Sequence, residues 1–117
     1  MKPGEEKHMN QIAKTPDPLY YAVVFTSVRT AIDDGYAETA EKMMALASEQ
    51  TGFLGVESVR DESGLGITVS YWKDRESILN WKNHAAHQQA QKFGKDKWYR
   101  NFKIRVAKVE REYGDDI

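Results

Sequence analysis

The chain contains no cysteine, which excludes disulfide bonds, thiolate metal sites and cysteine nucleophiles. It has no apolar run near the roughly 18 residues that a membrane span needs, and its N-terminus lacks the apolar core of a secretory signal. Neither sign of charge dominates, because 17 Lys and Arg are balanced by 18 Asp and Glu. Together these absences predict a cytoplasmic protein with no nucleic-acid or membrane partner.

Proline is also scarce, and all 3 prolines lie within the first 18 residues. Because that stretch is polar and charged, we expect residues 1–18 to be an extension outside the folded core. The whole chain has 117 residues, which suits one domain. We place this domain at residues 19–113, with residues 114–117 as a charged tail.

The hydrophobic patterns that remain predict six secondary-structure elements. β-Branched and aromatic residues with two-residue periodicity indicate strands, and apolar residues at three- and four-residue spacing indicate helices. The expected elements are a strand at 19–28, a helix at 36–50, strands at 53–60 and 65–72, a helix at 74–92 and a strand at 98–113. Asp74 should cap the second helix, and Gly52 should adopt a left-handed conformation after the first. The apolar parity changes within the last strand, which predicts a bulge or a bend near Ala107.

This order of elements is the split βαβ arrangement. It predicts the α+β class and a ferredoxin-like βαββαβ fold, in which two helices cover one face of a four-stranded antiparallel sheet. The first strand carries apolar residues on both of its faces, with Tyr21, Val23 and Phe25 on one and Ala22 and Val24 on the other. A strand of this kind is covered on both sides. Since no further element is left to cover the second face, we expect a homodimer with sheets packed face to face.

Two stretches, GFLGVESVRDESGLGITVSYWKD and ILNWKNHAAHQQAQ, resemble the antibiotic biosynthesis monooxygenase (ABM) family. The shared features are the element order, a Gly-Phe-Leu-Gly opening to the second strand and a Tyr-Trp pair closing the third. The resemblance extends from Tyr20 to Tyr113. It implies a dimeric α+β barrel. The family includes cofactor-free oxygenases of polyphenolic substrates, haem-degrading monooxygenases and members of unknown activity.

The haem-degrading branch of this family has a recognisable pattern of three residues. An Asn lies on the first strand, a Trp on the second helix and a His about three turns further on. Trp81 matches the Trp, but Gln91 occupies the His position and no Asn lies between Leu19 and Thr30. Two of the three residues are missing, so haem is disfavoured and no cofactor is predicted.

The candidate catalytic residues are His84 and His87, which are neighbours on the second predicted helix. Imidazole is a frequent general base, because histidine titrates near neutral pH. A metal ion would need a third ligand that the nearby sequence does not offer, so no metal site is predicted. A helical wheel gives the alternative, a surface or interface role, because it turns both histidines away from the apolar face. That face is defined by Ile78, Leu79, Ala85, Ala86, Ala90 and Phe93.

A ligand pocket between the sheet and the helices is the second candidate. On the helical wheel Lys82 falls near the middle of the apolar face and Trp81 at its margin, where an indole can stack on a planar ligand or seal the core. The expected pocket residues are Phe25, Ser27, Met43, Ile67, Val69, Tyr71, Trp81 and Lys82. The same side chains suit an ordinary packed core, and only a cavity distinguishes the two interpretations.

The leading functional hypothesis follows from the resemblance. It is an ABM-type monooxygenase that oxidises a small aromatic or quinol-like substrate without a cofactor, with His84 or His87 as the base. The alternatives are a non-catalytic, ligand-binding or stress-related dimeric module and a haem-binding protein. The sequence does not name the substrate.

Overall fold

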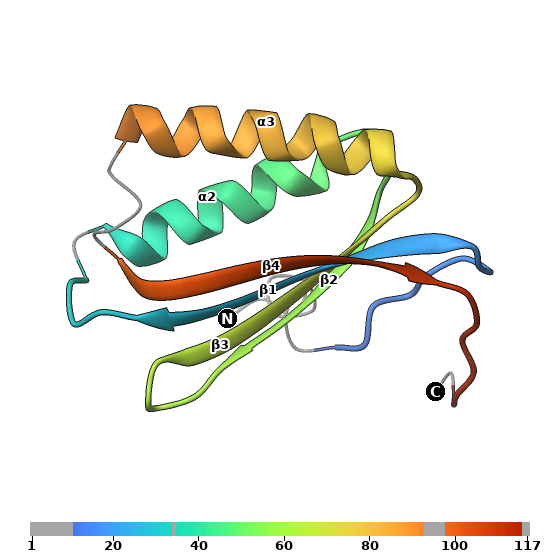
Figure 1. Cartoon of the computed structure of the whole chain (residues 1–117), viewed down its shortest axis with the longest axis horizontal. Helices are drawn as coiled ribbons and strands as arrows, with labels where there is room; N and C mark the ends of the chain where they lie inside the picture. Colours follow the sequence, from blue (N-terminus) through green and yellow to red (C-terminus); the bar gives the residue numbers. More distant parts are fainter. Residues whose placement is uncertain (1–10, 34, 93–97, 116–117) are drawn as a thin grey trace.

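The computed structural model describes residues 11–33, 35–92 and 98–115, with the backbone alone for residues 87–92. Its elements are, in order, β1 (Tyr20–Arg29), α2 (Tyr36–Ser48), β2 (Phe53–Arg60), β3 (Leu65–Trp72), α3 (Arg75–Lys92) and β4 (Tyr99–Val109). The strands form one antiparallel sheet in the order β2-β3-β1-β4, and both helices lie on one side of it (Figure 1). The predicted ferredoxin-like α+β fold is therefore confirmed.

Five of the six predicted elements match the observed ones to within two residues, and the exception is the last strand. That strand ends at Val109 instead of residue 113. Its pairing with β1 is regular from Asn101 to Val109, and the register shift lies between Val28 and Arg29. The bulge predicted near Ala107 is therefore wrong. The apparent parity change arose from Val109, which lies in regular register on the other face of the sheet, and from Tyr113, which lies beyond the end of the strand.

The two helices begin and end where local chemistry directs them. The carboxylate of Asp74 accepts hydrogen bonds from the backbone N–H of Ser77 at 2.8 Å and from its hydroxyl at 2.7 Å, which is the predicted cap of α3. These bonds lower the pKa of Asp74 below its usual value. Gly52 has a φ of 88°, the predicted left-handed conformation. Within the described residues, neither helix is long and apolar enough to cross a membrane.

The strand register assigns every side chain of the sheet to one of two faces. We call the side covered by α2 and α3 the helix face. Trp72 lies on it, because its ring stacks on Trp81 of α3, and so does Ser27, which Arg60 links to Tyr36 of α2. We call the other side the open face. It carries Ala22 and Val24 of β1 together with Ile67, Val69 and Tyr71 of β3.

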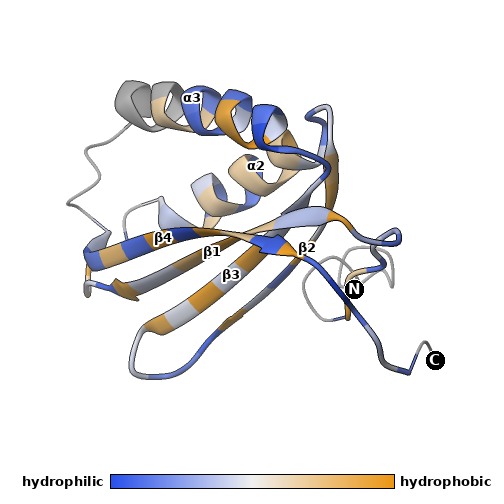
Figure 2. Cartoon of the chain, turned by 45° about the vertical axis from the view of Figure 1, so that its right-hand side comes forward, coloured by the Kyte–Doolittle hydropathy of each residue, from blue (hydrophilic) through white to orange (hydrophobic). Residues whose placement is uncertain are grey.

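The helices cover the helix face unevenly. The backbone of α2 approaches β2 most closely and that of α3 approaches β3, so the β1–β4 half of the sheet is less covered. Phe102, Ile104 and Val106 of β4 face the helix side, and they are 43%, 53% and 54% exposed. We call these three residues the β4 strip. Figure 2 shows apolar residues alternating with polar ones along this strand.

The described part of the N-terminal extension is tied to the sheet rather than separate from it. The backbone N–H of Ala13 donates to Glu57 of β2 at 2.9 Å, and the hydroxyl of Tyr71 donates to the other oxygen of Glu57 at 2.7 Å. The hydroxyl of Thr15 donates to Glu112 at 2.7 Å. Residues 11–18 therefore contact both β2 and the chain beyond β4, and they share a carboxylate with the open face.

Replacement of Gly52 by alanine should destabilise the protein. The left-handed φ strains any side chain, and a Cβ at this position would lie 2.0 Å from Oγ of Ser77, the residue that Asp74 caps. We expect the free energy of unfolding in urea to fall by about 1–3 kcal/mol. Gly114→Ala is the matched control, because a Cβ there meets no atom within 4 Å. Equal unfolding midpoints for the two variants would contradict the steric argument.

Candidate functional site

A stack of three rings joins α3 to the sheet. The fully buried Trp72 ends β3, and its ring lies 6.2 Å from that of Trp81 at an interplanar angle of 22°. The ring of Trp81 stacks in turn on His84, with centroids 5.7 Å apart and 28° between the planes. Phe53 of β2 packs edge-on against Trp72 at 5.4 Å. Large aromatic contacts of this kind fix ring orientations, so the stack holds the imidazole in place.

The imidazole of His84 carries the one buried polar atom of the stack that has no partner among the described residues. This atom, Nε2, is buried from solvent and makes no hydrogen bond to any of them, whereas Nε1 of Trp72 donates to the hydroxyl of Ser70 at 2.8 Å. An unpaired buried nitrogen costs about 1–3 kcal/mol. Native proteins seldom retain such atoms without a reason, so Nε2 is a candidate contact for a ligand. The side chain of His87 lies outside the described residues.

The buried face of α3 differs from the one that the helical wheel predicted. His84 is half-buried instead of solvent-facing, while Lys82 and Leu79, expected in the apolar face, are exposed. The face in contact with the rest of the protein is centred on Ser77, Trp81 and His84. Packing of the indole on Trp72 decided this orientation, because a Trp side chain buries far more area than the alanines that defined the predicted face.

The residues predicted to form one ligand pocket lie on opposite sides of the sheet. Phe25 and Ser27 are on the helix face, where Met43 of α2 and Trp81 of α3 also lie. Ile67, Val69 and Tyr71 are on the open face. The structure therefore does not bring the predicted set together. Successive side chains of a strand point to opposite faces of the sheet, and this alternation separates the two groups. The strand sequences alone do not show which of the two faces the helices cover.

A second group of polar side chains lies on the helix face at the C-terminal end of β1. Arg60 donates to Oγ of Ser27 at 2.8 Å and to the hydroxyl of Tyr36 at 3.5 Å. The hydroxyl of Tyr99 donates to that of Tyr36 at 3.4 Å, and the guanidinium carbon of Arg29 lies 3.5 Å from the centre of the Tyr36 ring. We call Arg29, Tyr36, Arg60 and Tyr99 the Arg–Tyr cluster.

Sequence reasoning missed the Arg–Tyr cluster. Its members come from four elements, and the contacts of Arg60 with Ser27 and of Tyr99 with Tyr36 join residues 33 and 63 positions apart. Burial raises the pKa of Tyr99, and its hydrogen bond to Tyr36 raises it further. The phenol therefore remains a neutral donor at physiological pH.

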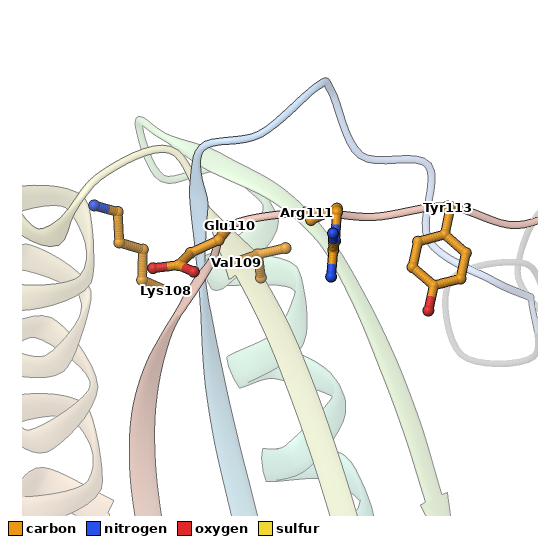
Figure 3. Close-up of a pocket in the computed structure, with 5 residues that line it drawn as sticks. All are labelled: Lys108, Val109, Glu110, Arg111 and Tyr113. Carbon is orange, nitrogen blue, oxygen red and sulfur yellow. The ribbon is translucent and has the colours of Figure 1, made fainter.

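The structure also has two surface hollows. The larger, of about 690 Å³, is lined by Lys108, Val109, Glu110, Arg111 and Tyr113. Figure 3 shows that these side chains point in different directions instead of converging. Since one short stretch supplies its whole lining, this hollow has no opposing wall and we assign no site to it. The smaller, of about 250 Å³, is lined mainly by open-face residues of β1, β3 and β4.

Metal-binding residues do not gather in the part of the chain that the structure describes. Within it, no three His, Asp or Glu side chains lie close enough together to hold a metal ion.

Comparison with known sequences decides the family. A sequence model of the family described as "Antibiotic biosynthesis monooxygenase" matches residues 19–92, which is more than half of the chain. The chain is a member of the antibiotic biosynthesis monooxygenase family. The resemblance inferred from its sequence motifs is thereby confirmed.

Two relatives illustrate the range of this ABM protein's similarity. It is 53% identical over 104 residues to the uncharacterized protein YqjZ of Bacillus subtilis (strain 168), and the match covers 89% of this chain and 91% of that protein. It is 29% identical over 94 residues to the jasmonate monooxygenase ABM of Pyricularia oryzae. That match covers 76% of this chain but only 43% of the fungal protein.

Solved structures share the fold of this ABM protein. The crystal structure of PA3566 from Pseudomonas aeruginosa superposes with a TM-score of 0.64 at 14% identity, covering 84% of this chain and 99% of that one. The structure of NE2512, a protein of unknown function from Nitrosomonas europaea, also gives 0.64, at 9% identity and with coverage of 86% and 99%. At such identities the likeness establishes the fold alone.

Removal of the unpartnered nitrogen should stabilise the protein. His84→Phe keeps a ring that can stack on Trp81 but leaves no polar atom buried there, so we expect the free energy of unfolding to rise by about 1 kcal/mol. Chemical denaturation followed by circular dichroism measures this change. Asn83→Ala, at an exposed neighbouring position, should change stability by less than about 0.5 kcal/mol. A clear loss of stability in His84→Phe would show that the imidazole nitrogens stabilise the fold and would contradict the cost assigned to Nε2.

Proposed function

We propose that this ABM protein is a cofactor-independent monooxygenase that oxidises a small aromatic, quinol-like substrate on the helix face of its sheet. The observation that carries the proposal is the buried, unpartnered Nε2 of His84. Membership of the family supports the monooxygenase class, and so does the name of the fungal relative, a jasmonate monooxygenase.

The β1–β4 half of the helix face suits a planar, apolar substrate. The exposed β4 strip adjoins Phe25 of β1, whose ring lies 5.8 Å from that of Phe102. An aromatic ring placed on this surface would remove apolar area from water, which is worth roughly 25 cal/mol for each Å² buried. His84 lies on the same side of the sheet, nine residues after the start of α3 and therefore about 14 Å along the helix axis.

In the proposed reaction the protein supplies a base and an apolar surface, and the substrate supplies the electrons. Nε2 of His84 takes the proton of a substrate hydroxyl and leaves an electron-rich anion. The anion reduces dioxygen, so that one oxygen atom bonds to a ring carbon and the other leaves as water. Hydroquinone and dioxygen would thus give hydroxybenzoquinone and water. The ring provides all four electrons, and no external reductant is needed.

Oxygen uptake with a panel of dihydroxy-aromatic compounds tests this proposal. Jasmonic acid is tested beside this panel as a non-aromatic compound, because the fungal relative is named for it. The wild type should consume oxygen above a protein-free control with at least one compound. His84→Phe should lose about 100-fold or more of that rate, the usual contribution of a general base, while Asn83→Ala retains it.

The pattern of results separates the hypotheses. No uptake across the panel, or full activity of His84→Phe, would contradict the proposed chemistry. A compound that raises the melting temperature of the wild type without any oxygen uptake would instead support the ligand-binding module.

We also propose that the protein is a homodimer in which two open faces pack together. The support is the apolar character of the open face. Val59 and Ile67 are exposed there, and they share this face with other apolar side chains such as Val24 and Val69. Among the described residues, the 11–18 segment and Glu112 reach this side, both at its edge. A second copy of the same surface would cover the rest by two-fold symmetry.

Charge placed on the open face should break the dimer. Sedimentation of the wild type at micromolar concentration should give about twice the 13.4 kDa mass of the chain, and Ile67→Glu should give the monomer, because a carboxylate cannot be buried unpaired in an interface. Leu79→Glu is the control, since Leu79 is an exposed aliphatic residue on α3. A wild-type mass near 13.4 kDa would refute the dimer.

A further inference from the structure

We propose that the Arg–Tyr cluster is a binding site for a carboxylate, carried by an amphipathic small molecule whose apolar part lies on the β4 strip. Nothing in the family match or in the names of the relatives points to these residues. The proposal rests on the charge of the cluster, on its hydrogen-bonding capacity and on its continuity with the exposed apolar surface.

Within the part of the chain that the structure describes, the cluster carries more positive charge than its neighbours neutralise. The one described carboxylate paired with Arg29 is that of Asp33, at 3.6 Å, and the side chain of Asp33 is 84% exposed. Among the described residues, Arg60 has no carboxylate within ion-pair distance. Its guanidinium donates to the carbonyl oxygens of Ser27 and Gly64 and to the hydroxyls of Ser27 and Tyr36. These acceptors are neutral, so they satisfy its N–H groups without balancing its charge.

The hydroxyl of Tyr36 is positioned to donate to an anion. It accepts hydrogen bonds from Arg60 at 3.5 Å and from Tyr99 at 3.4 Å, and within the described residues its own proton has no acceptor. Both accepted bonds are long for their type, so either donor can turn toward a better acceptor. A carboxylate oxygen beside Tyr36 would offer one to all three groups, and hydrogen bonds to a charged acceptor are stronger than neutral ones.

The cluster is continuous with the β4 strip. The ring of Tyr99 lies 5.5 Å from Phe25 and 6.2 Å from Phe102, and Phe102 begins the β4 strip. Tyr36, Arg60 and Tyr99 are half-buried, so they are held in place without being sealed from ligands. An apolar surface that ends in two guanidinium groups and two phenols complements a molecule with an apolar body and an acidic end.

The inferred ligand class is thus a flat or compact apolar molecule with one carboxylate. The inference deepens the proposed function, on which it rests for the identity of the substrate, because it adds an acidic group to the quinol-like ring. Binding can be measured without oxygen. Failure of the catalytic proposal and failure of this one can therefore be distinguished.

Calorimetric titration with 2,5-dihydroxybenzoate and with its methyl ester, both without oxygen, tests the site. The two probes share a quinol ring and differ in the charge of the carboxyl group. The wild type should bind the acid at least about tenfold more tightly than the ester, the factor expected of one charge-assisted hydrogen bond. Tyr36→Phe, which removes only a hydroxyl, and Arg60→Gln should each bring this ratio toward one while the affinity for the ester stays unchanged.

Two controls keep the outcome interpretable. Arg111→Gln makes the same change of charge at an exposed position beyond β4 and should leave the ratio unaltered. Tyr36→Phe keeps the experiment decisive if Arg60→Gln unfolds, because Arg60 also bonds backbone carbonyls. Equal affinities of the wild type for acid and ester, binding of neither probe, or a ratio unmoved by Tyr36→Phe would each overturn the proposal. Oxygen uptake without any preference for the acid would count against this site alone.

Discussion

The packing of Trp72 on Trp81 is the contact on which the rest of the structure depends. Trp72 is the last residue of β3, the strand between β2 and β1. It pairs with Tyr21 of β1 and with Phe53 of β2. A buried indole is one of the largest contributions that a single side chain makes to a core. By docking its own indole there, α3 is held over β3, and the β1–β4 half keeps its apolar side chains accessible. The uneven cover of the helix face is therefore a consequence of this contact.

The sheet divides the molecule into two surfaces of different chemical character. On the helix face lie the rings of the stack, the β4 strip and the Arg–Tyr cluster, which together combine a nitrogen without a partner, an accessible apolar surface and uncompensated positive charge. The open face has an apolar centre and the edge contacts of residues 11–18. β1 lies inside the sheet and supplies side chains to both faces. A polar substitution in β1 therefore tests the proposed ligand surface when the residue points to the helix face, and the proposed dimer interface when it points to the open face.

The sequence predicted the elements well because strand periodicity is a local property. The bounds of β2 and β3 matched, and Asp74 and Gly52 acted as their residue types suggest. The orientation of α3 could not be predicted in the same way. Its sequence has a weak apolar face, so one contact between large rings outweighed several alanines and turned His84 inward and Lys82 outward. The Arg–Tyr cluster was out of reach for a different reason, because it exists only once β1, α2, β2 and β4 are assembled.

Two energetically costly groups lie on the helix face, and their shared location bears on their function. They are Nε2 of His84, which has no hydrogen-bond partner among the described residues, and Arg60, whose described acceptors are all neutral. A stable core gains nothing from an unpaired imidazole nitrogen, and a half-buried arginine beside neutral acceptors is costly without a counter-charge. Sequences that break such rules usually do so at functional sites. Along β1, the residue paired with Trp72 and the residue bonded to Arg60 are six positions apart, roughly 20 Å, and α3 runs back over this span from the Trp72 end (Figure 1). Both groups therefore lie on one face of the sheet, which is why we propose the proton acceptor and the carboxylate site for the same surface.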